Sequence, residues 1–429
     1  MPFETGAVAR QKIAIVGAGV SGMGAAHALS AAHDVTLIEA EPRLGGHART
    51  IVAGKRGDQP VDTGFIVFNY VNYPQMTGLF EALDVPVIKS DMSFGATING
   101  GWLEYNLQNY RGMFAQTRNL LRPAYAGMLR DILRFHAGAK DAAADPTLTL
   151  GGLVEKLRLG RWFQEYFLLP FSGAIWSTPL ERMLDYPAQP LVRFFDNHGL
   201  LQAKGAHQWY TVRGGSREYV TRLEAAARAH GATIRLGAPV QGLRRVPGGV
   251  ELRCAGGEWE GFDHVVLATH SDASLALLSD PSPEEAAALG AMRYQANDAY
   301  LHCDPSVMPA RKACWASWVY QGDHSRPRDR IGVSYWMNSL QPFIPADDLL
   351  LVTLNPQDPI REEMIYDQTS FMHPVYDHAS WAAQEALRGM QGQRNTWFCG
   401  AYMKNGFHED GYSSGLDVAR ALGVAPAWA

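Results

Sequence analysis

The spacing of apolar residues changes period twice within the first forty positions. An apolar run from Lys12 to Val16 predicts a buried strand, and an Ala-rich stretch after it predicts a helix. A second apolar run from Asp34 to Ile38 predicts another strand. The order strand, helix, strand is typical of a βαβ unit in a parallel sheet.

Three glycines lie between the first strand and the helix, in the pattern G-x-G-x-x-G. Gly17 allows a tight turn, Gly19 allows the backbone to approach a pyrophosphate, and Gly22 allows the helix to pack closely on the strand. Glu39 ends the second strand, where a carboxylate can accept hydrogen bonds from a ribose. A glycine turn with a purely structural role is the alternative, but the flanking strands, helix and acid favour a dinucleotide site.

Later segments predict further parts of the same domain. Residues Trp209 to Leu243 predict a glycine turn, a helix and a strand, and Phe262 to Thr269 predicts a buried strand. Near the end of the chain, the pattern predicts a strand, a glycine-rich loop and a helix that begins near Gly415. We expect these dispersed segments to converge on one cofactor.

The composition excludes several classes of protein. Of 429 residues, 47% are hydrophobic and 19% are charged, which predicts a folded globular chain. The net charge of -5 disfavours binding to nucleic acid. The 4 cysteines form no CxxC pair, so neither a disulfide framework nor a metal site is expected. The polar N-terminus and the absence of an apolar run of about 20 residues predict a cytoplasmic protein, with any membrane contact peripheral and at the inner face.

The residues after Glu39 distinguish between cofactors. The sequence AEPRLGGHA places Arg43, Gly45 and Gly46 just beyond the second strand. This resembles the ExxxRxGG extension of glutathione-reductase-like FAD proteins, in particular the flavin-containing amine oxidase and phytoene-desaturase superfamily. VDTGFIVFN, from Val61 to Asn69, resembles the D-x-G segment that this superfamily places under the flavin. The resemblance implies FAD, and we expect it to be bound non-covalently because Cys399 ends an apolar strand.

The fold expected from this resemblance is α/β. It comprises a Rossmann FAD-binding domain (1–72, 206–275 and 393–429) and a discontinuous, mixed α+β substrate domain (73–205 and 276–392). Val240 would lie at the adenine side, and the C-terminal helix would face the flavin edge where negative charge develops. The predicted cofactor-binding residues are Gly17, Gly19, Val20, Ser21, Gly22, Glu39, Ala40, Arg43, Gly45, Gly46, His47, Thr63, Gly64, Phe65, Val240, Ala268, Thr269, Gly400, Ala401, Gly411, Gly415 and Leu416.

A narrower resemblance covers nearly the whole chain. Segments such as LGGHA, FLLPFSGAIWST, VRFFDNHGLL, QWYTVRGGSREYV and GFHEDGYSSG are similar to a bacterial subfamily of NAD/FAD-binding proteins within this superfamily. That subfamily resembles flavin-dependent desaturases of methyl-branched phospholipid acyl chains, which occur alongside methyltransferases of the cyclopropane-fatty-acid-synthase type. The implied partners are a lipid or other apolar small molecule and such a methyltransferase.

Departures from ordinary amine oxidases favour the acyl chain as substrate. Those enzymes usually have Arg where His47 stands, and a Lys in the stretch that corresponds to Met292 to His302, which has none. The resemblance then implies desaturation or isomerisation of an acyl chain by hydride transfer to flavin N5. An amine oxidase that releases hydrogen peroxide is the first alternative, and a non-catalytic flavin-binding partner of a lipid-modifying enzyme is the second.

Two groups of residues are predicted to carry the chemistry. His408 and Glu409 are the candidates for a proton-transferring pair, although the same residues could simply shape their loop. Tyr335, Trp336 and Tyr402 are candidates for the walls of the substrate pocket.

A basic, apolar stretch from Arg111 to Arg134 stands out from the acidic remainder. It could lie on an anionic membrane surface, or form two amphipathic helices that pack on the core.

Overall fold

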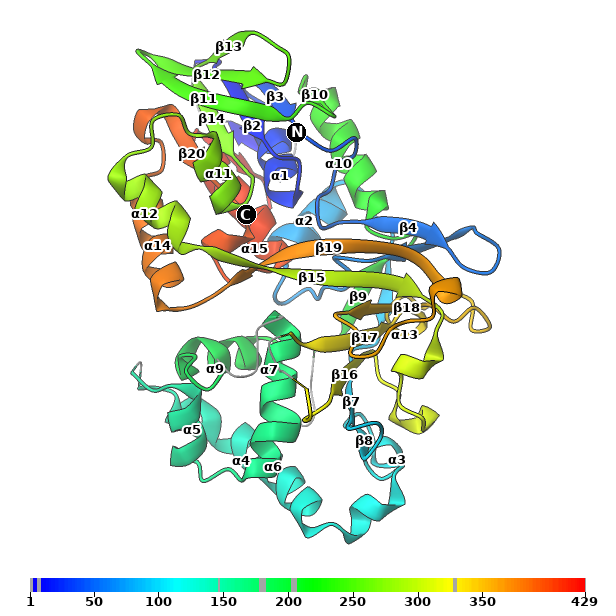
Figure 1. Ribbon diagram of the computed structural model, residues 1–429. Coiled ribbons are helices and arrows are strands. Elements are labelled where there is room, and N and C mark those ends of the chain that lie inside the picture. The colour runs from blue at the N-terminus through cyan, green and yellow to red at the C-terminus, as the bar shows by residue number, and fades with distance from the viewer. Residues whose placement is uncertain are drawn as a thin grey trace.

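The computed structural model describes residues 3–5, 9–145, 147–176, 183–201, 207–326 and 330–428. Figure 1 shows two parts. The upper part is a parallel sheet packed with helices, and the lower part contains a helical region. The long strands β15 (Arg293–His302) and β19 (Ile365–Val375) lie between them. The predicted division between domains at 205 and 206 lies outside the described residues. The predicted α/β fold class is confirmed.

A five-stranded parallel sheet forms the core of the upper part, in the order β10-β3-β2-β14-β20. Four of the five residues of β2, and four of the five of β3, are buried, as their apolar sequences require. The predicted βαβ unit is present, with strands at the expected bounds. The strands are β2 (Lys12–Val16), β3 (Asp34–Ile38), β10 (Thr233–Arg235), β14 (His264–Leu267) and β20 (Thr396–Phe398).

Helix α1 (Val20–Leu29) is buried along its whole length, between the sheet and two other helices, α10 (Arg217–Ala229) and α15 (His408–Ala421). Glycines make the contact between α1 and α15 possible. A Cβ atom at Gly415 would lie 2.2 Å from the carbonyl oxygen of Ser21, and one at Gly24 would lie 2.6 Å from the ring of Tyr412. The first helix of the sheet and the last helix of the chain therefore touch backbone to backbone.

Helix α15 begins at His408, seven residues before the predicted start near Gly415. Phe407 is extended and its backbone N–H donates to the Asp410 carboxylate at 3.0 Å, which caps the helix. The glycines at 411 and 415 lie inside the helix because they face α1, where small residues are needed. The predicted start near Gly415 was therefore wrong, because part of the segment predicted as a glycine-rich loop forms the first turns of the helix.

Smaller elements cover the sheet. An antiparallel sheet of β11 (Val240–Val246), β12 (Gly249–Cys254) and β13 (Trp259–Phe262) packs over one face. The other elements of this part are β1 (Phe3–Thr5), β4 (Thr50–Ala53), β5 (Gln59–Asp62), α2 (Pro74–Ala82), α11 (Ser271–Leu277), α12 (Pro283–Ala291), α14 (His378–Gly389) and β21 (Val424–Pro426).

The lower part is built on a seven-stranded mixed sheet in the order β19-β15-β18-β17-β16-β7-β8. Its helices bury a second apolar core. Its remaining elements are β6 (Val87–Ser90), β7 (Phe94–Ile98), β8 (Leu103–Asn106), α3 (Tyr110–Met113), α4 (Pro123–Ala142), α5 (Leu150–Lys156), α6 (Arg161–Phe163), α7 (Leu169–Trp176), α9 (Ala188–Asn197), β9 (Trp209–Val212), β16 (Trp318–Gly322), β17 (Gly332–Trp336), α13 (Met337–Leu340) and β18 (Leu351–Leu354).

The basic stretch from Arg111 to Arg134 spans α3, a 3-10 turn (Thr117–Leu121) and most of α4. Helix α4 buries Tyr125, Met128 and Phe135 in the lower core, so its apolar face packs as the second alternative describes. Among the described residues, no helix is both long and apolar enough to cross a bilayer.

Candidate functional site

A cavity of about 1040 Å³ lies where the two parts meet. It opens at the carboxyl ends of β2, β3 and β14, which is where parallel sheets bind ligands. Most predicted cofactor-binding residues line it: Gly17, Gly19, Val20, Ser21, Glu39, Ala40, Gly45, Gly46, His47, Thr63, Gly64, Phe65, Val240, Ala268, Thr269, Gly400 and Ala401. Gly22, Arg43, Gly411, Gly415 and Leu416 are not part of the lining.

The three glycines of the first turn have different surroundings. Gly17 has a φ of +100°, which favours glycine, and a Cβ at Gly22 would lie 1.9 Å from the Gly17 carbonyl oxygen. The fold itself therefore requires both. A Cβ at Gly19 would meet no protein atom within 4 Å, because Gly19 faces the cavity. Open space at this glycine, beside the N-terminus of α1, is what a pyrophosphate needs.

Glu39 also fits a dinucleotide. Its carboxylate accepts hydrogen bonds from the backbone N–H groups of Ala18, at 2.6 Å, and Glu41, at 2.8 Å. These bonds fix the carboxylate at the cavity wall and leave lone pairs for ribose hydroxyls. The residues present thus fit the phosphates and ribose of FAD.

The Gly45–Gly46 pair approaches the glycine turn as the motif predicts. The Gly45 N–H donates to the Ala18 carbonyl at 2.9 Å, and a Cβ at Gly46 would lie 3.1 Å from the Cα of Gly19. Arg43, expected to neutralise phosphate charge, instead donates to the Gly46 carbonyl at 3.0 Å and pairs with Glu41. Both contacts lie within the same loop, so the Arg43 side chain stabilises the Gly45–Gly46 pair from the side away from the cavity.

Asp62 anchors the segment Thr63 to Phe65 at the cavity floor. Its buried carboxylate accepts from the Thr50 hydroxyl at 2.6 Å, the Ser216 backbone N–H at 2.8 Å and the Gln341 amide at 2.7 Å. Burial raises the pKa of Asp62 to about 6 despite these donors. The sequence motif located this segment. Thr50 faces Asp62 across the β4–β5 pair, but Ser216, before α10, and Gln341, after α13, are distant in sequence and could not be predicted.

The predicted His408–Glu409 pair is not formed. The Glu409 carboxylate accepts from the backbone N–H groups of Gln75, at 2.9 Å, and Met76, at 3.0 Å, and so caps the N-terminus of α2. Burial raises its pKa to about 7. His408 lines the cavity, but burial lowers its pKa to about 3, so it is neutral at physiological pH. Successive helix residues point in different directions, which is why the pair separates.

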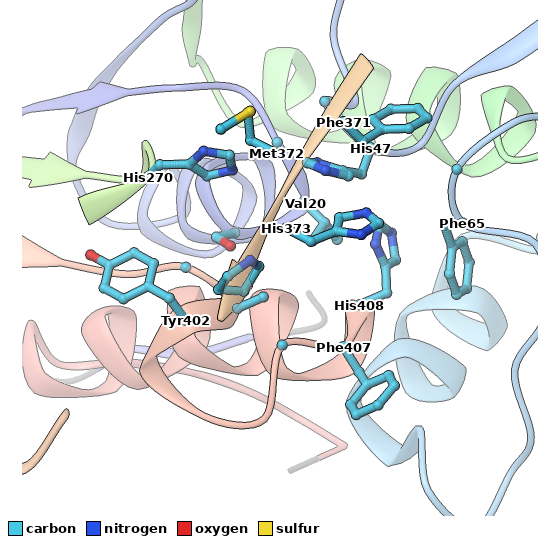
Figure 2. Close-up of a pocket in the computed structure, with 18 of the residues that line it drawn as sticks. Val20, His47, Phe65, His270, Phe371, Met372, His373, Tyr402, Phe407 and His408 are labelled. Carbon is cyan, nitrogen blue, oxygen red and sulfur yellow. The ribbon is translucent and has the colours of Figure 1, made fainter. Parts of the chain in front are cut away.

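Three further histidines of the cavity were missed, namely His198, His270 and His373. His270 and His373 lie around His47, at 6.0 Å and 5.7 Å between ring centroids (Figure 2). Burial lowers the pKa of His47 to about 3 and that of His373 to about 4, and it also lowers that of His270. The imidazoles are therefore neutral hydrogen-bonding groups. His270 directly follows the predicted lining residue Thr269, whereas no sequence signal marked His198, after α9, or His373, on β19.

The end of the cavity away from the glycine turn is aromatic and aliphatic. Tyr335 and Tyr402 line the cavity as predicted, but Trp336 does not. Adjacent residues of a strand face opposite sides, so Trp336 packs against Trp315 on the far side of β17 at 5.4 Å. The other apolar lining residues of this end are Met92, Phe94, Phe171, Ala174, Ile175, Phe194, Leu200, Trp209, Trp318 and Leu354.

None of the four cysteines lines the cavity. Cys399 is fully buried in the core around α1 and α15, and burial raises the pKa of its thiol to about 12. It is thus unsuited to carry a covalent flavin.

The upper part is a Rossmann sheet whose glycine turn and Glu39 form a dinucleotide-binding site. The lower part closes an apolar cavity over this site. Together they define an FAD-dependent oxidoreductase. The chain matches the family model of flavin containing amine oxidoreductases over residues 20–363, and it belongs to this family. FAD is its cofactor.

Solved structures with the same fold cover almost the whole chain. A CLA-producing fatty acid isomerase from P. acnes is 14% identical, with a TM-score of 0.65, and the alignment covers 97% of this chain and 99% of that one. A cyclohexylamine oxidase from Brevibacterium oxydans IH-35A is 16% identical (TM-score 0.65, 96% and 99% covered). A putrescine oxidase bound to putrescine is 13% identical (TM-score 0.67, 96% and 99% covered). No curated protein matches the sequence significantly.

Proposed function

We propose that this FAD oxidoreductase acts on an apolar acyl chain of a lipid, by introducing or moving a carbon–carbon double bond. The observation that carries this proposal is the apolar end of the cavity, where no described lining residue is charged. An apolar wall of this kind holds a hydrocarbon chain by desolvation and gives an ion no partner. Bound FAD would supply the two-electron chemistry, and the aromatic walls would exclude water and orient the chain.

The carboxylates near the cavity are poorly placed for a cationic amine. Glu39 and Glu41 line only the ribose end. Asp91, which precedes the lining residue Met92, already accepts from the Ser93, Ser317 and Ser339 hydroxyls at 3.0 to 3.2 Å. An ammonium group would therefore lose its hydration without gaining an ion pair.

Oxidation of an uncharged amine is the second candidate. The family and two of the similar structures are named for amines, and the aromatic wall of Trp318 and Tyr335, whose rings pack edge to face at 5.2 Å, could hold a neutral amine. The two candidates differ in substrate and in product, so one set of incubations separates them.

We expect phospholipids with methyl-branched acyl chains to react with the FAD-loaded protein under anaerobic conditions. Desaturation would bleach the flavin absorbance and yield a product lacking a pair of hydrogens, whereas isomerisation would move a double bond without lasting bleaching. Straight-chain phospholipids and primary amines are the comparison substrates. The Ala174→Phe variant narrows the apolar end and should keep FAD while losing the reaction with lipid.

Bleaching by amines, with hydrogen peroxide released in air, would replace the acyl proposal with the second candidate. A flavin that neither substrate class changes, with no altered lipid product, would favour a non-catalytic partner of a lipid-modifying enzyme such as a methyltransferase.

A lipid substrate requires contact with a membrane, and the turn Thr117–Leu121 is the surface that we propose for it. Leu120 and Leu121 are 62% and 86% exposed. The segment that carries them joins α3 to α4 at the end of the lower part (Figure 1). Arg111 and Arg118 are exposed close to them in sequence, and no exposed acid lies between residues 107 and 130. Exposed leucines beside cations suit an anionic bilayer.

The structure changes which residues should be replaced to test this contact. Arg118 donates to the Gly101 carbonyl, and Arg122 donates to the Trp102 carbonyl and stacks on the Trp102 ring at 4.6 Å. Replacing these arginines would disturb the fold, so the leucines make the cleaner test. We expect the double variant Leu120→Ser with Leu121→Ser to bind liposomes of anionic phospholipid at least about tenfold more weakly in co-sedimentation, because burying one leucine contributes about 1.5–3 kcal/mol.

Leu133→Ser is the matched control, since Leu133 is 61% exposed on α4 but lies outside the turn. Equal binding by the double variant and the control would remove the turn from the proposal.

A further inference from the structure

The contact between His408 and Tyr219 lies at the cavity wall. His408 is the first residue of α15 and lines the cavity, whereas Tyr219 lies on α10 and is fully buried. The Tyr219 hydroxyl oxygen lies 2.6 Å from His408 Nε2, and the imidazole stacks on the Phe65 ring with centroids 3.9 Å apart (Figure 2). One edge and one face of the imidazole are thus held in place.

Tyr219 determines which imidazole nitrogen carries the proton. Burial raises the pKa of the Tyr219 hydroxyl well above its ordinary value, so the hydroxyl keeps its proton. Among the described residues, His408 Nε2 is the hydrogen-bond partner of that hydroxyl. If Nε2 were the donor, the buried tyrosine proton would have no acceptor, at a cost of about 1–3 kcal/mol. The hydroxyl therefore donates to Nε2, and the neutral imidazole carries its proton on Nδ1.

Nδ1 is open to the cavity. Nδ1 has no hydrogen-bond partner among the described residues, and protein atoms do not bury it completely. A proton acceptor needs a free lone pair, but the lone pair of this tautomer is occupied by Tyr219. His408 thus offers the cavity a donor.

We propose that Tyr219 positions His408 to donate a hydrogen bond from Nδ1 to an acceptor atom of the group bound in the cavity. The acceptor belongs either to the flavin ring or to a substrate carbonyl, and the chemistry at His408 is the same in both cases. His408 is then a binding residue and Tyr219 a positioning residue, in place of the predicted proton transfer. The inference rests on the proposed function only where the acceptor is a substrate carbonyl.

The tautomer can be measured directly in the FAD-loaded protein labelled with ¹⁵N-histidine. We expect the nitrogen resonances of His408, identified by their loss in His408→Gln, to show the proton on Nδ1. Tyr219→Phe removes only the hydroxyl and should shift the proton toward Nε2. Tyr412→Phe is the control, because its hydroxyl is also buried, lies on α15 and has no partner among the described residues. A proton on Nε2 in the unaltered protein would overturn the proposal.

The acceptor can be identified with two further measurements. If it belongs to the flavin, His408→Phe lowers the midpoint potential of the bound FAD, since the lost donor stabilised charge that develops on reduction, and His408→Gln restores part of it. If it belongs to the substrate, the potential stays constant and KM rises about three- to tenfold. No change in either quantity would contradict a donor role. Tautomer and potential are measured without substrate, so they stand even if the acyl proposal fails.

Discussion

Gly19→Val is expected to give a folded, colourless protein. Gly19 has φ −67° and ψ 178°, which valine adopts readily, and its missing side chain points into the cavity, where a Cβ meets no protein atom within 4 Å. The valine side chain would occupy the space of the pyrophosphate, so the affinity for FAD should fall by at least about a hundredfold. The measurements are the flavin absorbance of the purified protein and the melting temperature of the FAD-free forms.

Two other glycines provide the controls. A Cβ at Gly127, on α4 and remote from the cavity, also meets nothing within 4 Å, so Gly127→Val should remain yellow. Gly22→Val should fail to fold, since its Cβ would overlap the Gly17 carbonyl. A yellow Gly19→Val protein with normal FAD affinity would show that the cofactor lies elsewhere.

Arg245→Met is expected to lower the free energy of unfolding by about 3–5 kcal/mol, because it leaves a buried carboxylate without its main partner. Arg245 and Glu285 are only 5% and 6% exposed and lie 2.6 Å apart. Arg245 also donates to the Thr396 hydroxyl at 3.1 Å, and thus ties the antiparallel sheet to α12 and β20. Urea denaturation measures the loss.

Arg228→Met tests whether any lost ion pair would have the same effect. Arg228 pairs with Glu224 one turn away on α10, but both side chains are partly exposed to water, at 48% and 32%. Such pairs contribute about 0.3–0.5 kcal/mol. Similar losses in the two variants would mean that burial does not determine the strength of the Arg245 pair.

The predictable part of the site is the part encoded locally. The turn from Gly17 to Gly22 and the acid Glu39 lie within one βαβ unit, where strand and helix periods fix their relative positions. His198 and His373 could not be found in this way, because α9 and β19 are far from that unit in sequence and only the tertiary fold brings their side chains to the cavity. Likewise, Tyr335 and Trp336 were both predicted as pocket residues. They differ only in the face of β17 on which they lie, and the sequence does not show which face borders the cavity.

The predicted proton-transferring pair shows a different limit of sequence reasoning. His408 and Glu409 are adjacent in sequence, which made them an attractive pair. Their environments depend on Tyr219 and on the N-terminus of α2, which are remote in the chain. Packing thus decided both the direction and the protonation of these side chains.

The contact of α15 with α1 has a consequence for the order of events during synthesis. The glycine turn is made well before β20 and α15, which complete the sheet and the cavity wall and lie within residues 396–421. A nascent chain that still lacks β20 and α15 has the glycine turn but not the complete FAD-binding cavity. We therefore expect tight retention of FAD to begin only after α15 has left the ribosome, and not when the glycine turn alone has been made.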